Sequence, residues 1–247
     1  MAKVISIINQ KGGVGKTTTA CHLAMAAVER GLSVALVDFD SQGNSGAILS
    51  RNPSMNRERE GGAQELFDSM EPVFAETEFG ISLLHGHKWL EELDMRDNVL
   101  DEALTMRDRI RSLPFDYVLF DTPPAPCMRQ MAPLFWSDLV VVPVEPTELS
   151  MSGLVSMIET INQARRVNPG LAYRLMVNRH INSSGQQRLI LDDLKAKLPG
   201  MIIGEFKLRV PVADALSHGV PVWKYTKDKA LRQEWLEFCY RVLDLVK

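Results

Sequence analysis

Short runs of apolar residues alternate along the chain with longer stretches in which apolar positions recur at helical spacing. The runs are apolar throughout rather than alternating, which is typical of strands covered on both faces of a parallel sheet. They predict strands at Val4–Ile8, Val34–Val37, Ile81–Leu84, Tyr117–Phe120, Leu139–Val144, Arg174–Val177 and Met201–Ile203. The helical stretches are Thr17–Arg30, Leu90–Leu113, Glu148–Val167, Gln186–Leu198 and Lys229–Val246.

This alternation of strands and helices predicts an α/β fold with a doubly wound, mostly parallel sheet and helices on both faces. We expect a single domain over residues 1–247, because no repeat or linker interrupts the pattern. The polar segment 51–62 is interpreted as a surface loop. The apolar stripe of the last helix predicts that it packs against the sheet.

Composition favours a globular cytoplasmic protein. Of the 247 residues, 45% are hydrophobic and 24% charged, and no apolar run approaches the ~20 residues of a membrane-spanning helix. The start of the chain does not have the pattern of a signal peptide. Cys21, Cys127 and Cys239 are odd in number and far apart, so they do not predict a disulfide framework.

A glycine-rich segment, QKGGVGKTT at residues 10–18, follows the first predicted strand and opens the first predicted helix. In this context successive backbone N–H groups and the helix N-terminus converge on an anion. We expect Lys16 to reach the β- and γ-phosphates of a nucleotide and the Thr17 hydroxyl to ligate Mg²⁺. The loop residues expected to bind phosphate are Gly12, Gly13, Val14, Gly15, Lys16, Thr17 and Thr18.

The form KGGVGKTT resembles the deviant Walker A motif of the ParA/MinD superfamily of P-loop ATPases, and its flanks resemble the ParA/Soj partition branch. Residues 37–44 (VDFDSQGN) are similar to the second motif of that family, and residues 118–124 (VLFDTPP) to its Walker B motif. The resemblance covers nearly the whole chain and is weakest over 51–113. It implies ATP and Mg²⁺ as cofactors and ATP hydrolysis to ADP as the activity.

Carboxylates follow two of the predicted strands. Asp121 ends an apolar run, where a carboxylate holds Mg²⁺ through a water, and Asp38 is a second candidate for the metal site. Asp38 and Asp40 share a face if that segment stays extended, and one of them then orients or deprotonates the attacking water. The resemblance assigns this role to Asp40. The alternative for both residues is capping of the next helix.

Lys11 is a second lysine in a loop that needs one. In the family it crosses to the phosphates of the partner subunit, so the resemblance implies a catalytic role for Lys11 in an ATP-dependent homodimer. The alternative is an exposed lysine that adds positive potential. For the base, Asn178 after a strand suits the edge of adenine, and the resemblance places Asn178 and Pro211 beside it.

Charge is distributed unevenly. Residues 1–150 hold 13 Lys and Arg against 22 Asp and Glu, whereas residues 151–230 hold 12 against 6. The basic portion predicts a sequence-indifferent DNA surface, with surface scatter as the alternative. Its candidate contacts are Arg165, Arg166, Arg179, Arg188, Lys195, Lys197, Lys207 and Arg209.

The resulting hypothesis is an ATP-driven switch that binds nonspecific DNA, becomes associated with the nucleoid in its ATP state, and works with a ParB-like activator to partition DNA or another cargo. A MinD-like membrane switch is the main alternative, which would need an amphipathic tail. A third alternative, an iron–sulfur protein resembling the nitrogenase iron protein, would need a second suitably placed cysteine, which this sequence does not offer. A small-molecule kinase leaves Lys11 without a role.

Overall fold

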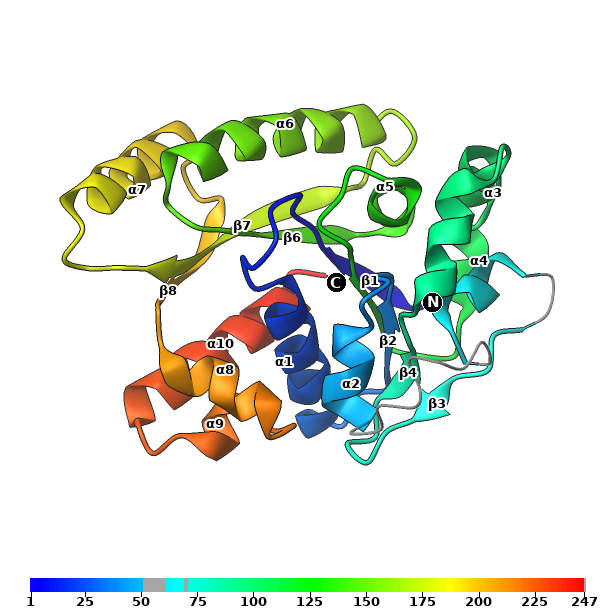
Figure 1. Ribbon diagram of the computed structural model, residues 1–247, viewed down its shortest axis with the longest axis horizontal. Helices are drawn as coiled ribbons and strands as arrows, with labels where there is room; N and C mark the ends of the chain where they lie inside the picture. Colours follow the sequence, from blue (N-terminus) through cyan, green and yellow to red (C-terminus); the bar gives the residue numbers. More distant parts are fainter. Residues whose placement is uncertain (51–60, 69–70, 247) are drawn as a thin grey trace.

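The computed structural model describes residues 1–50, 61–68 and 71–246 (Figure 1). Its strands are β1 Lys3–Ile7, β2 Val34–Asp38, β3 Ala75–Glu76, β4 Ser82–Leu84, β5 Tyr117–Asp121, β6 Leu139–Val144, β7 Ala172–His180 and β8 Ile202–Lys207. Its α-helices are α1 Lys16–Glu29, α2 Asn44–Ser50, α3 Val99–Thr105, α4 Arg107–Ser112, α5 Met128–Trp136, α6 Glu148–Ala164, α7 Gly185–Lys197, α8 Val210–Ser217, α9 Val222–Tyr225 and α10 Lys229–Asp244. Two 3₁₀ helices are η2 Ala63–Phe67 and η3 Lys88–Met95.

The eight strands form one sheet in the order β3-β4-β2-β5-β1-β6-β7-β8. All neighbouring strands are parallel except β3, which runs antiparallel to β4 at the edge. Every residue of β5 and β6 is buried, as expected for central strands covered on both faces. The predicted doubly wound α/β fold is confirmed.

Helices cover both faces of the sheet (Figure 1). Helices α5, α6 and α7 lie over one face, and α1, α8 and α10 over the other. The core is accordingly divided into two hydrophobic clusters, one on each side of the strands. The apolar stripe of α10, with Trp235 and Phe238 buried, packs on the second cluster as predicted.

The stretch Leu90–Leu113 is not one helix, so that prediction is wrong. It is divided into η3, α3 and α4. The turn at Asp97–Asn98 separates the first two. Helices α2, α5, α8 and α9 and the two-residue strand β3 were not predicted, since each is short or lacks a full helical repeat.

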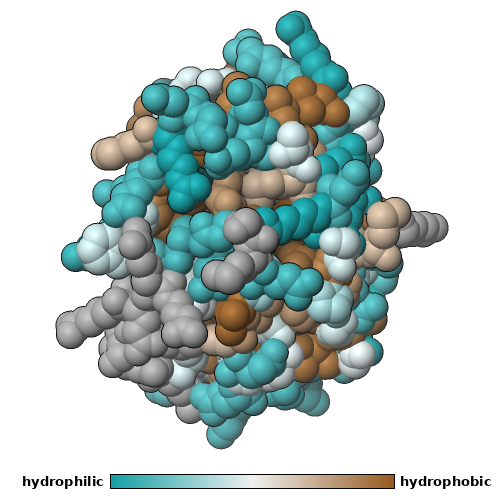
Figure 2. Space-filling view, turned by 90° about the vertical axis from the view of Figure 1, so that its right-hand side faces the viewer, coloured by the Kyte–Doolittle hydropathy of each residue, from teal (hydrophilic) through white to brown (hydrophobic). Residues whose placement is uncertain are grey.

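The face over α3 and β3 is seen in Figure 2. In its coloured part, hydrophobic residues form separate patches between hydrophilic ones. The exposed apolar side chains on η3 and α3 are Trp89, Met95, Leu100 and Leu104. Most of the predicted loop 51–62 lies outside the described residues, and its last residue, Gly62, forms a parallel bridge with His85. No helix in the described parts of the chain is long and apolar enough to cross a membrane.

The parallel arrangement brings the carboxyl ends of the central strands to one edge of the sheet. Asp38 at the end of β2 and Ile7 at the end of β1 are both register partners of Asp121 at the end of β5. The segments that follow these strands therefore meet, which is where doubly wound sheets bind ligands.

Candidate functional site

The glycine-rich loop connects β1 to α1 at this edge. Gly13 and Gly15 have φ angles of +76° and +102°, a left-handed conformation that residues with a side chain rarely adopt. A Cβ on Gly15 would also come 2.4 Å from Nδ2 of Asn178. Because Gly15 occupies the N-cap position without a side chain, the first N–H groups of α1 are left for an external anion.

Lys16 lies at the start of α1, with only 8% of the residue exposed. Its Nζ donates to the carbonyl oxygen of Lys11 at 3.1 Å, so the amine points back across the loop. Burial lowers the pKa of Lys16, and the charges of Asp121 and Asp40 counteract part of this effect. The loop lysine therefore lies within electrostatic reach of both carboxylates.

Asp121 is buried beside the loop. One carboxylate oxygen, Oδ2, accepts a hydrogen bond from Ser45 Oγ at 2.7 Å, whereas Oδ1 is buried without a hydrogen-bond partner. Burial raises the pKa of Asp121 to about 6, against the effects of the Ser45 and Thr17 hydroxyls and the Lys16 charge. An unpartnered carboxylate oxygen near a threonine hydroxyl fits Mg²⁺, which prefers oxygen ligands. No group of three or more His, Cys, Asp or Glu side chains forms a metal site within the described residues, so water and phosphate oxygens would complete the coordination.

Asp38 is also buried, but both of its carboxylate oxygens accept backbone hydrogen bonds. Oδ2 accepts from the N–H groups of Ser45 and Gly46 at the start of α2, at 2.9 and 3.3 Å. Oδ1 accepts from the N–H of Asp40 at 3.0 Å. Burial, together with the neighbouring charge of Asp121, raises the pKa of Asp38 well above its usual value. In this structure Asp38 acts as a cap for α2, and its role at a metal remains a prediction.

Asp40 lies beyond the end of β2, which stops at Asp38. Because the strand stops there, the two carboxylates do not lie on one strand. Asp40 is half-buried, and its Oδ1 accepts from the N–H of Gln42 at 3.0 Å in a tight turn. Its charge acts on both Lys16 and Asp121, which places it at the same site.

Lys11 is held by its own chain. Its Nζ forms an ion pair with Glu145 Oε2 at 2.8 Å and lies 3.0 Å from Ser150 Oγ near the start of α6. Its backbone N–H donates to the Asn9 side chain at 2.8 Å. The exposed-lysine alternative does not describe this arrangement, because the amine has two partners.

A cavity of about 370 Å³ adjoins the loop, a volume within the range of small-molecule sites. Asn178 lines it, but the side chain also fastens the loop, since Nδ2 donates to the carbonyl oxygen of Val14 at 2.8 Å. Pro211 is in the first turn of α8 and is not among the residues that line the cavity, although its neighbours Val210 and Val212 are. The full lining is Gly13, Gly15, Thr18, Asn178, Arg179, Lys207, Leu208, Arg209, Val210, Val212, Ala213 and Trp235.

The structure separates the eight basic candidates. Arg179 belongs to the loop site, because its Nη1 donates to the Gly13 carbonyl at 2.7 Å and lies 3.4 Å from Glu145. Lys207 is the last residue of β8, and Arg209 is the N-cap residue of α8, on the same edge of the sheet. Three others lie near helix ends: Arg165 and Arg166 follow α6, and Lys197 ends α7. Lys195 pairs with Glu205.

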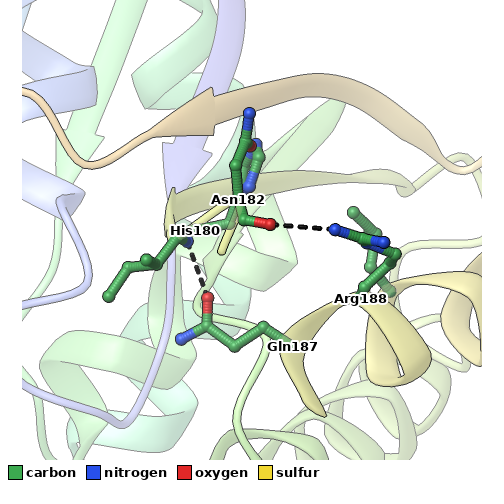
Figure 3. Close-up of a pocket in the computed structure, with 6 residues that line it drawn as sticks. His180, Asn182, Gln187 and Arg188 are labelled. Carbon is green, nitrogen blue, oxygen red and sulfur yellow. Dashed lines mark hydrogen bonds between the residues drawn. The ribbon is translucent and has the colours of Figure 1, made fainter. Parts of the chain in front are cut away.

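Arg188 lies beside a second hollow, formed where β7 leads into α7 (Figure 3). Its Nη2 donates to the carbonyl oxygen of Asn182 at 3.1 Å, and Gln187 accepts from the N–H of Ile181 at 2.7 Å. His180 completes the polar lining. These contacts hold the start of α7 and leave Arg188 exposed at the carboxyl edge of the sheet.

Three residues at the site were not singled out from the sequence. Glu145 and Ser45 hold Lys11 and Asp121, and nothing in their local sequence signals either contact. Arg129 donates to the Phe39 carbonyl beside Asp40 at 2.9 Å. A detectable signal existed for Arg129, because it is the one charged residue in the apolar helix MRQMAPLFW.

A glycine-rich loop between a parallel strand and a helix, a lysine at the helix start and a buried aspartate on the adjacent strand define a P-loop nucleoside triphosphatase fold. The AAA_31 family model, described as an AAA domain, matches residues 2–173. The chain belongs to this family and is of the ParA/MinD type.

Two relatives by sequence support this assignment. Protein IncC of Escherichia coli is 34% identical over 242 residues, covering 92% of this chain. The chain spans only 65% of the length of that relative. The chromosome partitioning protein ParA of Caulobacter vibrioides is 29% identical, covering 98% of this chain and 94% of its own.

A solved structure has the same fold. Cobyrinic acid a,c-diamide synthase from Mycobacterium smegmatis, with bound ADP and magnesium, matches with a TM-score of 0.77 at 25% identity. The match covers 98% of this chain and 94% of that chain. The likeness therefore includes the helices that follow the family match, up to α10.

Proposed function

We propose that residues 1–247 act as one ATPase domain that binds ATP with Mg²⁺, dimerises in that state and binds nonspecific DNA. A ParB-like activator stimulates hydrolysis and releases the DNA, so that DNA or another cargo is positioned. The protein then works in the cytoplasm, on the nucleoid in its ATP state. The observation that carries the proposal is the convergence of Lys16, the open N-terminus of α1 and the unpartnered oxygen of Asp121.

The residues divide the chemistry of hydrolysis among them. Backbone N–H groups of the loop 12–18 and the Lys16 amine bind the phosphates and neutralise charge that develops on them. Thr17, Asp121 and Asp38 would hold Mg²⁺, which would supply polarisation of the phosphate oxygens. Asp40 orients a water for attack on the γ-phosphorus and accepts its proton, while the bond from that phosphorus to the bridging oxygen of ADP breaks.

Lys11 makes the reaction depend on a second subunit in this proposal. The amine leaves Glu145 and Ser150 and contacts phosphate across the dimer, in the manner of an arginine finger. Asn178 and the cavity it lines are proposed to receive the base, with Pro211 nearby on α8.

For DNA, the structure favours the residues at the carboxyl edge of the sheet. Arg188, Lys207 and Arg209 lie on neighbouring elements there, whereas Arg165 and Arg166 lie where α6 ends. Contacts of this kind go to phosphates and carry no sequence information.

The test is binding of the Asp40→Ala protein to a nonspecific DNA duplex with ATP–Mg²⁺, with ADP–Mg²⁺ and with neither, over a salt series. We expect binding with ATP alone, and contact with about four phosphates gives a log–log salt slope near −3.6. Lys16→Ala should abolish binding, and Lys11→Ala should bind nucleotide without forming the ATP-dependent dimer.

Charge reversal at the carboxyl edge supplies the matched comparison. Arg188→Glu should weaken DNA binding by about tenfold or more, since it opposes phosphate contacts. Lys197→Glu makes the same change of charge at the far end of α7, beside Asp193, and should have little effect. If the protein dimerises with ATP but does not bind DNA with ATP, with ADP or without nucleotide, the proposed DNA binding is refuted. Binding to lipid vesicles or to another protein would then be tested.

A further inference from the structure

A buried arginine on another element donates a hydrogen bond to the turn that contains Asp40. Arg129 lies in the first turn of α5 with 7% of the residue exposed. Its Nη1 donates to the carbonyl oxygen of Phe39, the residue before Asp40, at 2.9 Å. Its Nε donates to Asp94 Oδ2 at 2.8 Å, and its backbone N–H donates to Asp94 Oδ1 at 3.2 Å.

This arrangement gives the guanidinium one orientation. An arginine presents a rigid planar fork of donors, so two fixed acceptors on different elements determine its position. Asp94, at the end of η3, supplies the opposite charge that a buried cation requires. The Phe39 carbonyl is therefore held from α5, with η3 as the anchor behind it.

Other parts of the chain also fix the main chain around Asp40. The N–H of Phe39 donates to the Asp121 carbonyl at 2.8 Å, and the N–H of Asp40 donates to Asp38 at 3.0 Å. A Cβ added to Gly86 would come 2.1 Å from the Asp40 carbonyl oxygen, so the turn also packs closely against Gly86. Asp121 and Asp38 lie at the ends of β5 and β2, whereas Arg129 reaches the turn from a helix, α5.

The segment that leads to Arg129 also lies beside the phosphate loop. A Cβ on Gly12 would lie 4.0 Å from Cβ of Pro124, which places the segment 122–127 against the loop. Gln130, the next residue after Arg129, donates to the Pro123 carbonyl at 3.0 Å. Adjacent side chains of α5 therefore hold the segment beside the phosphate loop and the turn that contains Asp40.

We propose that Arg129 is a positioning residue for ATP hydrolysis: with Asp94 as its anchor, it holds the Phe39 carbonyl and so sets the place of Asp40 relative to the phosphate loop. This inference rests on the proposed function, because it takes Asp40 as the group that orients the attacking water. A purely structural role would fasten α5 to the fold and leave the chemical step of the folded protein unchanged.

The first experiment compares single-turnover hydrolysis of ATP–Mg²⁺ by wild type, Arg129→Met, Arg129→Lys and Asp94→Asn. We expect Arg129→Met to lower the rate of the chemical step about 10- to 100-fold, because a displacement of about 1 Å has effects of that size. The dissociation constant of a fluorescent ATP analogue should change less than twofold. Arg129→Lys should recover part of the rate, since a lysine amine reaches one of the two acceptors.

Arg111→Met is the matched control. Arg111 on α4 pairs with Asp138, before β6 and at the opposite edge of the sheet, so its loss removes a partly buried Arg–Asp pair far from the site. It should lower the melting temperature without changing the rate per folded molecule. Rates are therefore compared after the folded fraction of each variant has been measured.

A double-mutant cycle with Asp40→Ala decides whether Arg129 acts through Asp40. If it does, Arg129→Met lowers the residual rate of Asp40→Ala less than twofold, because the effect requires the Asp40 carboxylate. Equal factors in both backgrounds, a wild-type rate in Arg129→Met, or a nucleotide affinity that falls in parallel with the rate would each overturn the inference. Asp94→Asn and Arg129→Lys keep the test open if Arg129→Met does not fold.

Failure of the proposed function has its own signature. A wild-type protein that does not hydrolyse ATP, or an Asp40→Ala protein as active as wild type, refutes the proposed mechanism and this inference with it. Failure of Arg129→Met to alter the rate, with Asp40→Ala much slower than wild type, refutes only the inference.

Discussion

At Asp121, stability and chemistry are in conflict. Its side chain is fully buried, one oxygen has no hydrogen-bond partner, and burial raises its pKa to about 6. At neutral pH the carboxylate is still ionised, but its charge is less stable in the folded protein than in the unfolded chain. Such a group is retained for what it binds rather than for what it adds to stability.

Asp121→Asn should separate the two effects. Asparagine is neutral and keeps an oxygen to accept from Ser45, so we expect the free energy of unfolding at pH 7 to rise by about 1–3 kcal/mol. Mg²⁺-dependent hydrolysis should be lost. Urea unfolding at pH 7 measures the first effect. Asp116→Asn is the control of opposite sign, because hydrogen bonds from Ser33 lower the pKa of exposed Asp116 and favour its charge. A decrease in stability for Asp121→Asn would contradict the argument.

Residues whose role depends on local sequence could be predicted, and those whose role depends on distant contacts could not. Lys16 and Thr17 follow from their place between a strand and a helix. The contact of Arg129 with Phe39 joins residues 90 apart, and that of Lys11 with Glu145 joins residues 134 apart. Such pairs are determined by how the strands are ordered in the sheet, which no local pattern specifies.

Among the elements, α1 is tied to the C-terminal helices by one buried histidine. His22 Nδ1 lies 2.7 Å from the Thr18 carbonyl, and the N–H of Val222 donates to Nε2 at 3.1 Å. One neutral tautomer, with the proton on Nδ1, satisfies both contacts. The ring also packs against Trp223 and Trp235, with centroid distances of 5.5 and 4.6 Å. The helix that starts at the phosphate loop is therefore fastened to α9 and α10.

Acidification should weaken this connection. Burial lowers the pKa of His22 to about 4, so the unfolded chain binds the proton first, between pH 6.5 and 4. Below pH 6.5 the folded protein loses up to about 3 kcal/mol relative to a variant without this group. The stability difference between wild type and His22→Gln should therefore shrink by that amount as pH falls to 4. Urea unfolding at several pH values measures it, and a constant difference would contradict the assignment.

The pattern of elements was predictable where a periodic apolar pattern was long enough. Seven parallel strands and the helices α1, α6, α7 and α10 correspond to predicted stretches. The region from η3 to α4 does not correspond to its predicted stretch, because its apolar positions fit one long helix whereas a turn at Asp97 and Asn98 divides it.

For the whole molecule, nucleotide binding should appear as thermal stabilisation. A ligand at 100 times its dissociation constant stabilises the folded state by about 2.7 kcal/mol. For a chain of this size we expect ATP–Mg²⁺ to raise the melting temperature by about 5–11 °C. Lys16→Ala should remove this shift, because the loop lysine contributes to phosphate binding. Lys197→Ala, at an exposed ion pair with Asp193, should retain it. If Lys16→Ala shows the full rise in melting temperature, the nucleotide binds at a site other than the glycine-rich loop.

The ion pair between Lys11 and Glu145 has a consequence for how the amine meets any second molecule. An incoming anion does not capture a hydrated lysine; it displaces a carboxylate of the same chain, whose effective concentration lies in the millimolar range or above. The free energy of the new contact is therefore that of an exchange of partners. Because one ion pair replaces another, added salt screens both sides of the exchange. The Lys11 contact should then depend less on ionic strength than a contact made by a lysine that comes from solvent.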